Sequence, residues 1–120
     1  MKLSLYIKLL FLLPLFTFSQ GQIKISNLEY NLSAVSIGQI TSLKIPFSDI
    51  GDEPIIITKC QSANETSIIS SSKNPILPNQ SDTLNVKIIN NSIGNFRHTF
   101  LVAINNQENI NVIKVNINVL

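Results

Sequence analysis

The sequence has very little of the material from which catalytic and metal sites are built. Its 120 residues include one cysteine, one histidine and no tryptophan. A single cysteine excludes a disulfide within the chain and a zinc site made of several thiolates. A single histidine leaves few ways to assemble a catalytic group or a metal cluster. We therefore expect no catalytic residue, no metal ligand and no cofactor, and a protein that is not an enzyme.

Charged residues are also scarce, at 13 %, which is about half their usual share, whereas hydrophobic residues make up 44 %. This balance argues against disorder, which needs few apolar groups and many charges. The net charge of +2 comes from Lys2 and Lys8, since the rest of the chain has seven basic and seven acidic residues with no run of either sign. Nucleic-acid binding and attraction to an anionic membrane both need clustered basic residues, so we expect neither.

The first 19 residues predict a signal peptide for secretion. Two lysines are followed by a ten-residue run, 9–18, that is apolar apart from Thr17, and the small residues Thr17 and Ser19 mark a cleavage site. Positive charge stays inside the cell while a short apolar helix enters the membrane, and this directs export. We expect cleavage after Ser19 and, before cleavage, a helix at 3–18 that makes few contacts with the rest of the chain.

This apolar run is shorter than the ~20 residues that a stable transmembrane helix needs. An uncleaved N-terminal anchor is the alternative, and no cysteine follows the cleavage site directly, as it does in a bacterial lipoprotein. The expected protein is exported, periplasmic or secreted, with no stable membrane span after cleavage. Residues 20–120 then form one domain, since about 100 residues suffice to close a two-layer core.

Residues 20–120 predict short β-strands throughout. Isoleucine, valine and asparagine are frequent, and the first two favour strands whereas asparagine favours turns. Alternation with a period of two recurs, without a convincing helical period. The pattern predicts strands at 23–32 (broken near Ser26), 40–47, 55–60, 67–71, 82–89, 96–104 and 110–119. About seven short strands at this spacing are typical of an immunoglobulin-like antiparallel β-sandwich.

The apolar phase of these strands predicts which side chains form the core. In the last strand the phase shifts between Val112 and Ile113, which predicts a β-bulge there. The expected core consists of Leu43, Ile45, Phe47, Ile56, Leu84, Val86, Ile88, Phe96, Phe100, Val102, Val115 and Ile117.

Three segments, in order, resemble the motifs of one known family. Residues 47–57, Phe-Ser-Asp-Ile-Gly-Asp-Glu-Pro-Ile-Ile-Ile, are similar to Phe-x-Asn-x-Gly-x-x-Pro-Leu-x-Ile, with Asp49 in place of Asn. Residues 75–79, Pro-Ile-Leu-Pro-Asn, resemble Pro-Ile-x-Pro-Gly, with Asn79 in place of Gly. Residues 94–105 are similar to Gly-x-Phe-x-Lys-x-Ile-x-Val-x-x-Asn. These motifs resemble those of a family of exported bacterial domains, domain of unknown function 1573.

This resemblance covers residues 40–120 and implies a sandwich related to the major sperm protein and to pilus chaperones. The family has no established activity, so the resemblance implies a fold and export more than a function. Members often carry Ser-Cys-Gly-Cys-Thr where this chain has Lys-Cys-Gln-Ser-Ala at 59–63. Only Cys60 remains, so a role for paired thiols does not carry over. We expect Cys60 to be buried or inert, and the alternative is an intermolecular or redox role.

The other candidate side chains have structural explanations beside the functional ones. His98 is expected to be a partly exposed strand residue, because a catalytic histidine needs a nucleophile and an orienting acid. Asp49, Asp52 and Glu53 could offer oxygen ligands to calcium, but the spacing lacks the pattern of a calcium loop and predicts a solvated turn. Four Asn-x-Ser/Thr triplets occur by chance in a chain so rich in these residues, at Asn31, Asn64, Asn79 and Asn90.

From these observations we expect an exported non-catalytic binding or structural module of the bacterial cell envelope. The alternative is a redox-active or thiol-dependent envelope protein that uses Cys60. A protein partner is expected to add as a strand at an exposed sheet edge. We expect 110–119 to be such an edge, because Lys114 is its only charge and strands near chain ends often lie at edges. In that case Asn116→Lys blocks binding at little cost in stability.

Overall fold

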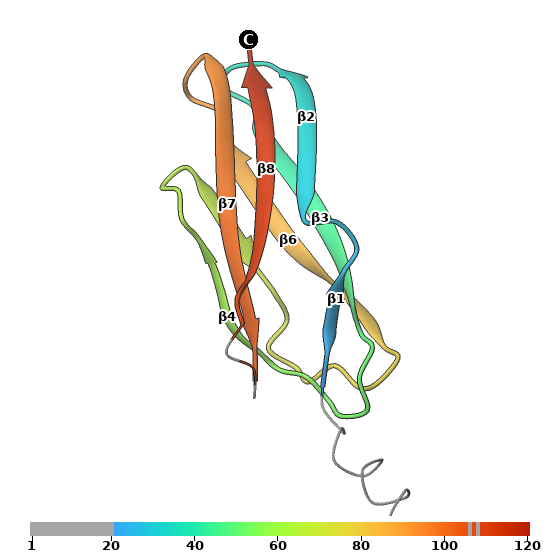
Figure 1. Ribbon diagram of the computed structural model, residues 1–120. Helices are drawn as coiled ribbons and strands as arrows, with labels where there is room; N and C mark the ends of the chain where they lie inside the picture. Colours follow the sequence, from blue (N-terminus) through green and yellow to red (C-terminus); the bar gives the residue numbers. More distant parts are fainter. Residues whose placement is uncertain (1–20, 106, 108) are drawn as a thin grey trace, which may run out of the picture.

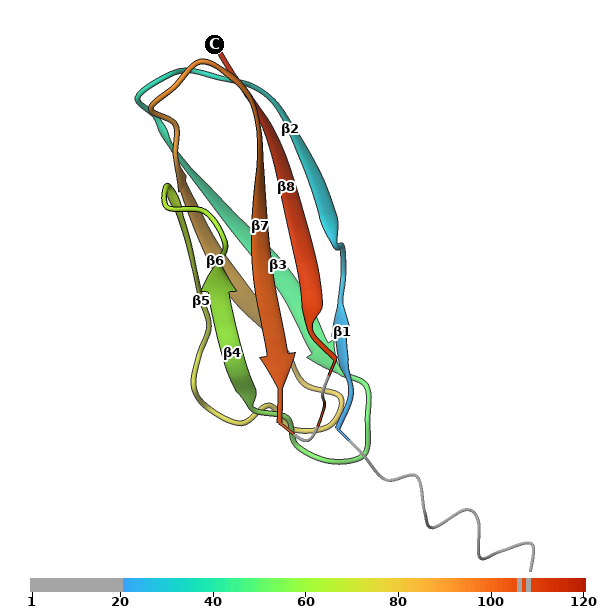
Figure 2. The ribbon, with the colours of Figure 1, turned by 60° about the vertical axis from the view of Figure 1, so that its left-hand side comes forward.

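Eight β-strands form two four-stranded sheets that face each other (Figures 1 and 2) in the computed structural model, which describes residues 21–105, 107 and 109–120. The first sheet has the order β1 (Ile23–Ile25), β3 (Ile40–Asp49), β6 (Ser81–Ile89) and β5 (Ser67–Ser70). The second sheet has the order β2 (Glu29–Val35), β8 (Asn111–Val119), β7 (Gly94–Ile104) and β4 (Ile57–Ser62). The predicted immunoglobulin-like β-sandwich is confirmed, with eight strands where about seven were expected.

The extra strand arises because the predicted strand 23–32 divides in two. β1 pairs antiparallel with β3 in the first sheet, and β2 pairs parallel with β8 in the second. The chain changes sheets between Ile25 and Glu29, where the Ser26 N–H donates to the Pro46 carbonyl at 3.0 Å. The break expected near Ser26 is therefore confirmed, and it moves the chain from one layer to the other.

Alternating apolar residues of both sheets form the core between them. Nine of the twelve predicted core residues are buried, and Leu43 is half-buried against the core. The prediction is wrong for Ile56 and Phe96, whose surfaces are 40 % and 39 % exposed. Ile56 points outward because its neighbour Ile55 is the inward residue. The buried cluster also includes residues that the prediction omitted: Ile55, Ile69, Ile76, Ile104, Ile113 and Val119.

The β-bulge predicted at Val112 and Ile113 is wrong. The register between β7 and β8 is continuous from Gly94↔Val119 to Val102↔Asn111. Val112 lies on the outer face, so the apolar run there reflects an exposed valine and not a shift of phase. Register shifts lie elsewhere, between Leu32 and Val35 in β2 and between Ile57 and Lys59 in β4.

The last strand is not a sheet edge, which corrects the expectation for 110–119. β8 lies between β2 and β7 and pairs with both (Figure 1). The edge positions are taken by β1 and β5 in the first sheet and by β2 and β4 in the second. The expectation failed because β2 pairs in parallel along one side of β8 and takes the edge position itself.

The predicted signal peptide and the predicted helix at 3–18 lie outside the described residues. In the part of the chain that the structure describes, no helix is long and apolar enough to cross a membrane.

Candidate binding site

The strands β4 and β5 form one side of the sandwich (Figure 2), and each is the outermost strand of its sheet. β5 pairs antiparallel with β6 over Ser67–Ser70 without a register shift. An edge strand leaves backbone N–H and C=O groups without a partner on its outer side. The opposite side of the sandwich is less regular, because β1 has three residues and β2 contains a register shift beside Ala34, whose φ is 50°. The other edge strand on this side, β4, has a register shift between Ile57 and Lys59, so β5 is the most regular open edge among the described residues.

Exposed isoleucines lie next to this edge on the outer face of the first sheet. Ile68 of β5 is 62 % exposed, and Ile40 and Ile89, which face each other across β3 and β6, are 64 % and 52 % exposed. With Glu65 and Lys87 they line a hollow of about 120 Å³. Exposed apolar side chains gathered in one place favour contact with a partner.

A second hollow, of about 210 Å³, opens at the end of the sandwich near the turn between β6 and β7. Phe96, His98 and Val119 line it from the second sheet, and it shares Thr66 and Ile89 with the first hollow. The half-exposed Phe96 therefore belongs to an accessible surface and not to the core. The two hollows together make a continuous surface beside β5, which we call the β5 surface.

His98 anchors the β5 surface from inside the sandwich. The imidazole is buried, which corrects the expected partial exposure, because β7 alternation turns His98 inward together with Phe100. Its Nδ1 lies 3.1 Å from Ser67 Oγ, and Ser67 Oγ lies 2.7 Å from Ser62 Oγ of β4. Burial lowers the pKa of the His98 imidazole, so the ring is neutral at neutral pH. This hydrogen-bonded chain links β7, β5 and β4.

Cys60 is half-buried on β4 and packs against the core with a free thiol. Burial raises the pKa of this thiol, and a hydrogen bond with the Ser71 side chain opposes the rise. Cys60 faces Val102 on β7, four residues from His98. That separation corresponds to about 13 Å along the strand. The two residues that enzymes most often combine for thiol chemistry are thus not brought together.

The three acidic side chains of the predicted turn differ in their exposure to solvent. Asp52 and Glu53 are exposed as expected, whereas Asp49 is fully buried, which corrects that part of the prediction. Asp49 Oδ1 accepts from the Gly51 N–H at 2.9 Å, and Oδ2 is buried without a hydrogen-bond partner among the described residues. The described residues contain no group of three His, Cys, Asp or Glu side chains that could hold a metal ion.

The three segments that resemble the family meet at one end of the sandwich. Ile55 and Ile76 exchange backbone hydrogen bonds of 2.9 and 2.8 Å, which joins the first segment to the second. Asn105 Oδ1, at the end of the third segment, accepts from the Ile56 N–H at 2.8 Å. Asn79 has a φ of 66°, a conformation that glycine and asparagine adopt most readily. The motifs in these segments are thus explained by the turns that they form and by the hydrogen bonds that join them to one another.

The asparagine triplets have different surroundings. Asn31 and Asn79 are exposed and Asn64 is half-buried. Asn90 is buried, and its Nδ2 donates to the Gln39 carbonyl and to Thr41 Oγ1, both at 2.9 Å. Asn90 is therefore a structural residue.

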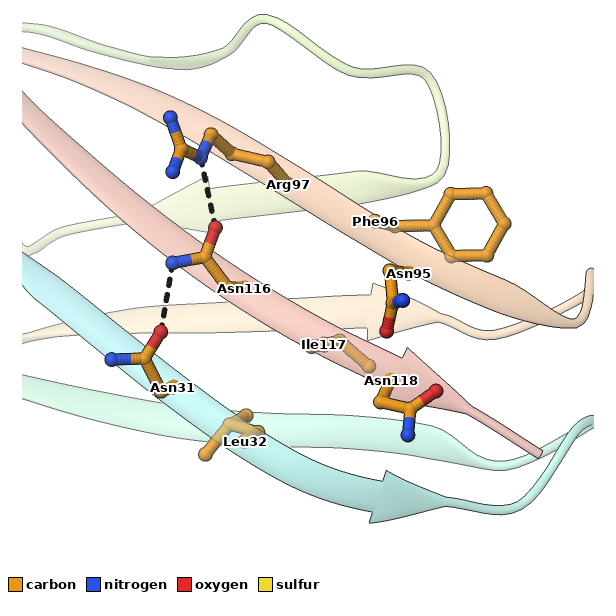
Figure 3. A pocket seen from close by; sticks show the side chains of 8 residues that line it. All are labelled: Asn31, Leu32, Asn95, Phe96, Arg97, Asn116, Ile117 and Asn118. Carbon is orange, nitrogen blue, oxygen red and sulfur yellow. Dashed lines mark hydrogen bonds between the residues drawn. The ribbon is translucent and has the colours of Figure 1, made fainter.

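The sequence analysis missed a groove of about 340 Å³ on the outer face of the second sheet (Figure 3). Asn31, Asn116 and Arg97 lie in one row across β2, β8 and β7, and Asn118 and Asn95 lie in the next row. A signal was present, because outward polar residues recur at every second position of these strands. Their clustering depends on strand pairing, which the sequence alone did not supply.

The profile of the family described as Protein of unknown function (DUF1573) matches residues 23–119. No curated protein matches the chain. Among solved structures, a protein of unknown function from Porphyromonas gingivalis W83 is similar, with a TM-score of 0.71, 16 % identity, and coverage of 83 % of this chain and 47 % of that one. This chain thus spans less than half of that protein.

Two further structures connect the fold to the types that the resemblance implied. The YadV chaperone has a TM-score of 0.60 at 12 % identity, over 80 % of this chain and 51 % of the chaperone. WR4, a C. elegans MSP family member, has a TM-score of 0.53 at 8 % identity, over 86 % of this chain and 100 % of WR4. At these identities the likeness concerns the fold, and it agrees with the expected relation to major sperm protein and chaperone sandwiches.

Proposed function

The chain belongs to the DUF1573 family of proteins of unknown function, and from that premise we propose that it is an exported, non-catalytic binding module of the bacterial cell envelope. The leader pattern at 1–19 supports export to the periplasm or beyond. The observation that carries the binding role is the open β5 edge beside two apolar hollows. At this edge a partner can bind both the unpaired backbone groups of β5 and the apolar side chains next to it.

The proposed partner is a protein segment that adds to β5 as a further strand. An added strand gains backbone hydrogen bonds from the edge, and pockets for its alternate side chains supply specificity. Ile68 and the hollow at Ile40 and Ile89 would receive apolar side chains on the outer face. The inner side of β5 is held by the contact between Ser67 and His98, so the edge is preorganised. A preorganised edge binds at a lower entropic cost.

A thiol-dependent function is the weaker reading. It needs a reactive thiolate at Cys60, and burial raises the pKa of that thiol. Cys60 also faces Val102 of β7, which lies four residues from His98 on that strand. A binding module needs neither residue to react, which favours the non-catalytic proposal.

The experiment places a photoreactive residue at Ser70, an exposed position of β5, and irradiates cells that export the protein. We expect one reproducible protein adduct. Ile68→Lys should abolish this adduct, because a charge on an edge strand opposes pairing with another strand. The matched control Ile50→Lys changes an isoleucine that is 53 % exposed, against 62 % for Ile68, directly after the end of β3, and should leave the adduct unchanged.

An adduct that survives Ile68→Lys would reject strand addition at β5. If Ile93→Lys, in the turn between β6 and β7, removes the adduct while Ile68→Lys does not, the loops are the site. An absence of any protein adduct at Ser70 in the envelope would reject the binding role of this edge altogether.

A further inference from the structure

We propose that the groove on the outer face of the second sheet binds a neutral saccharide. The groove is formed by β2, β8 and β7, whereas the β5 surface is centred on the edge of the first sheet. Its volume of about 340 Å³ exceeds those of both hollows of the β5 surface. That volume lies at the lower end of the range for small-ligand sites, about 300–1,000 Å³.

A hydrogen-bonded row fixes the floor of this groove (Figure 3). Arg97 Nε donates to Asn116 Oδ1 at 2.8 Å, and Asn116 Nδ2 donates to Asn31 Oδ1 at 2.9 Å and to Glu29 Oε1 at 3.0 Å. Both functional atoms of the Asn116 amide are therefore engaged, and they orient the side chains on either side. A ligand meets groups whose positions are already set, which reduces the entropy lost on binding.

Several polar groups in the groove remain available. Within the described residues, Asn31 Nδ2 and the terminal guanidinium nitrogens of Arg97 have no side-chain partner, and neither do the amides of Asn95 and Asn118. Each amide offers two N–H donors and one carbonyl acceptor. Ligand hydroxyl groups, which both donate and accept, match these amides and can also accept from the guanidinium.

The charge and the polarity of the groove select among ligand classes. Among the residues that line the groove Arg97 is the charged one, and Glu29, which lies beside the groove, is joined to it through Asn116, so the negative charge offsets the positive one. That balance disfavours an anion or a cation. Leu32 and Ile117 turn toward the sandwich interior, and Phe96 lies at the margin beyond β7, where it adds apolar surface beside the amides that the carbon-bound face of a sugar ring can contact (Figure 3). A neutral ligand rich in hydroxyl groups fits these conditions.

The test follows the side-chain amide signals of the purified ¹⁵N-labelled protein by NMR. The probes are glucose, galactose, mannose, N-acetylglucosamine and their oligomers, each up to about 20 mM because a shallow polar site implies millimolar affinity. We expect the amides of Asn31, Asn95 and Asn118 to shift with at least one probe. The dissociation constant should change less than about twofold between low salt and 0.5 M salt, because a neutral ligand releases no counterions.

Two variants locate the binding. Asn31→Ala combined with Asn118→Ala should weaken it at least about tenfold, since about two hydrogen bonds are lost. The control Asn85→Ala removes an exposed strand asparagine from the other outer face and should leave affinity unchanged. The proposal is overturned if no probe shifts these amides, if the double variant binds as well as the unaltered protein, or if sulfate or an extended peptide shifts them while every saccharide fails. Because strand addition uses the other sheet, the Ile68→Lys result is independent of this one.

Discussion

His98 on β7 and Ser67 on β5 lie in hydrogen-bond contact, with 3.1 Å between Nδ1 and Oγ, and so join the second sheet to the edge strand of the first. Both side chains are buried. His98 also lines the hollow at the end of the sandwich. The residue that holds the proposed binding edge in place is thus the only histidine of the chain.

This contact predicts a loss of stability on mild acidification. Burial lowers the pKa of the His98 imidazole below its ordinary value of 6.5. Below that pH the unfolded chain takes up a proton that the folded chain resists, so the free energy of unfolding falls as the pH decreases toward the folded pKa. Above the ordinary value both states are neutral and the effect vanishes. Urea unfolding at about pH 7.5 and at about pH 5.5 measures the difference.

The variant His98→Gln serves as the control, because its side chain is polar and does not titrate. We expect a smaller decrease in unfolding free energy between the two pH values for this variant. Since the chain has one histidine, the difference between the two proteins reports on His98 alone. Equal decreases would show that the folded protein accommodates the charged ring without penalty.

Asp49 predicts a stabilising substitution. Its Oδ1 accepts from the Gly51 N–H, whereas the buried Oδ2 lacks a donor. A buried carboxylate oxygen without a donor costs free energy of desolvation. Asp49→Asn keeps the acceptor for Gly51 and removes the charge, so we expect the unfolding free energy to rise by about 1 kcal/mol. The family motif that residues 47–57 resemble also has Asn at this position.

Asp49→Ala provides the contrast, because it removes the acceptor as well as the charge. We expect this variant to unfold more easily than Asp49→Asn by about 1–2 kcal/mol. Chemical denaturation of the three proteins at neutral pH gives both differences. An Asp49→Asn variant that is less stable than the unaltered protein would mean that the carboxylate has a partner in solution.

The sequence predicted the sandwich because strand alternation is a local property. In β3 and β6 the alternate residues Ile45, Phe47, Leu84 and Val86 are buried, as their period of two required. The prediction failed where that period is absent. Residues 55–57 are three isoleucines in succession, so nothing local decided that Ile55 and not Ile56 would face the core.

The candidate site was less predictable because it depends on pairing between distant segments. That β5 ends the first sheet follows from its pairing with β6, and that β8 is covered follows from its parallel pairing with β2. His98 shows a different limit. Its phase matched Phe100, but a polar ring was expected outside, and its partner Ser67 lies 31 positions away. Hydrogen bonds over such separations are not visible in a single sequence.

The burial of Cys60 predicts that its thiol reacts slowly with alkylating reagents in the folded protein. Burial raises the pKa of the thiol above its ordinary value of 9.0, so little thiolate is present at neutral pH. We expect iodoacetamide to modify the folded protein at least ~5-fold more slowly than the same chain in urea. Mass spectrometry of timed samples measures both rates. Faster modification of the folded protein would reverse this expectation and revive a thiol-dependent function.

The last prediction concerns Asn116, because its position in the sheet decides what a charge there does. Asn116 makes three side-chain hydrogen bonds, with Asn31, Glu29 and Arg97, in the middle of the second sheet. Asn116→Lys removes the acceptor for Arg97 and puts a like charge beside it. We expect the unfolding free energy to fall by about 1–3 kcal/mol.

Asn118→Lys is the matched comparison, since it lies two residues further along the outer face of β8 and is exposed. A lysine there keeps the row intact, so its effect should stay within ~0.5 kcal/mol. Denaturation of the two variants under identical conditions measures the difference. Equal stability would show that the Asn116 row contributes little and that β8 tolerates charge as an open edge does. A clear loss for Asn116→Lys alone would support the position of β8 inside the sheet, paired on both sides, so that strand addition has to use one of the edge strands, of which β5 is the proposed one.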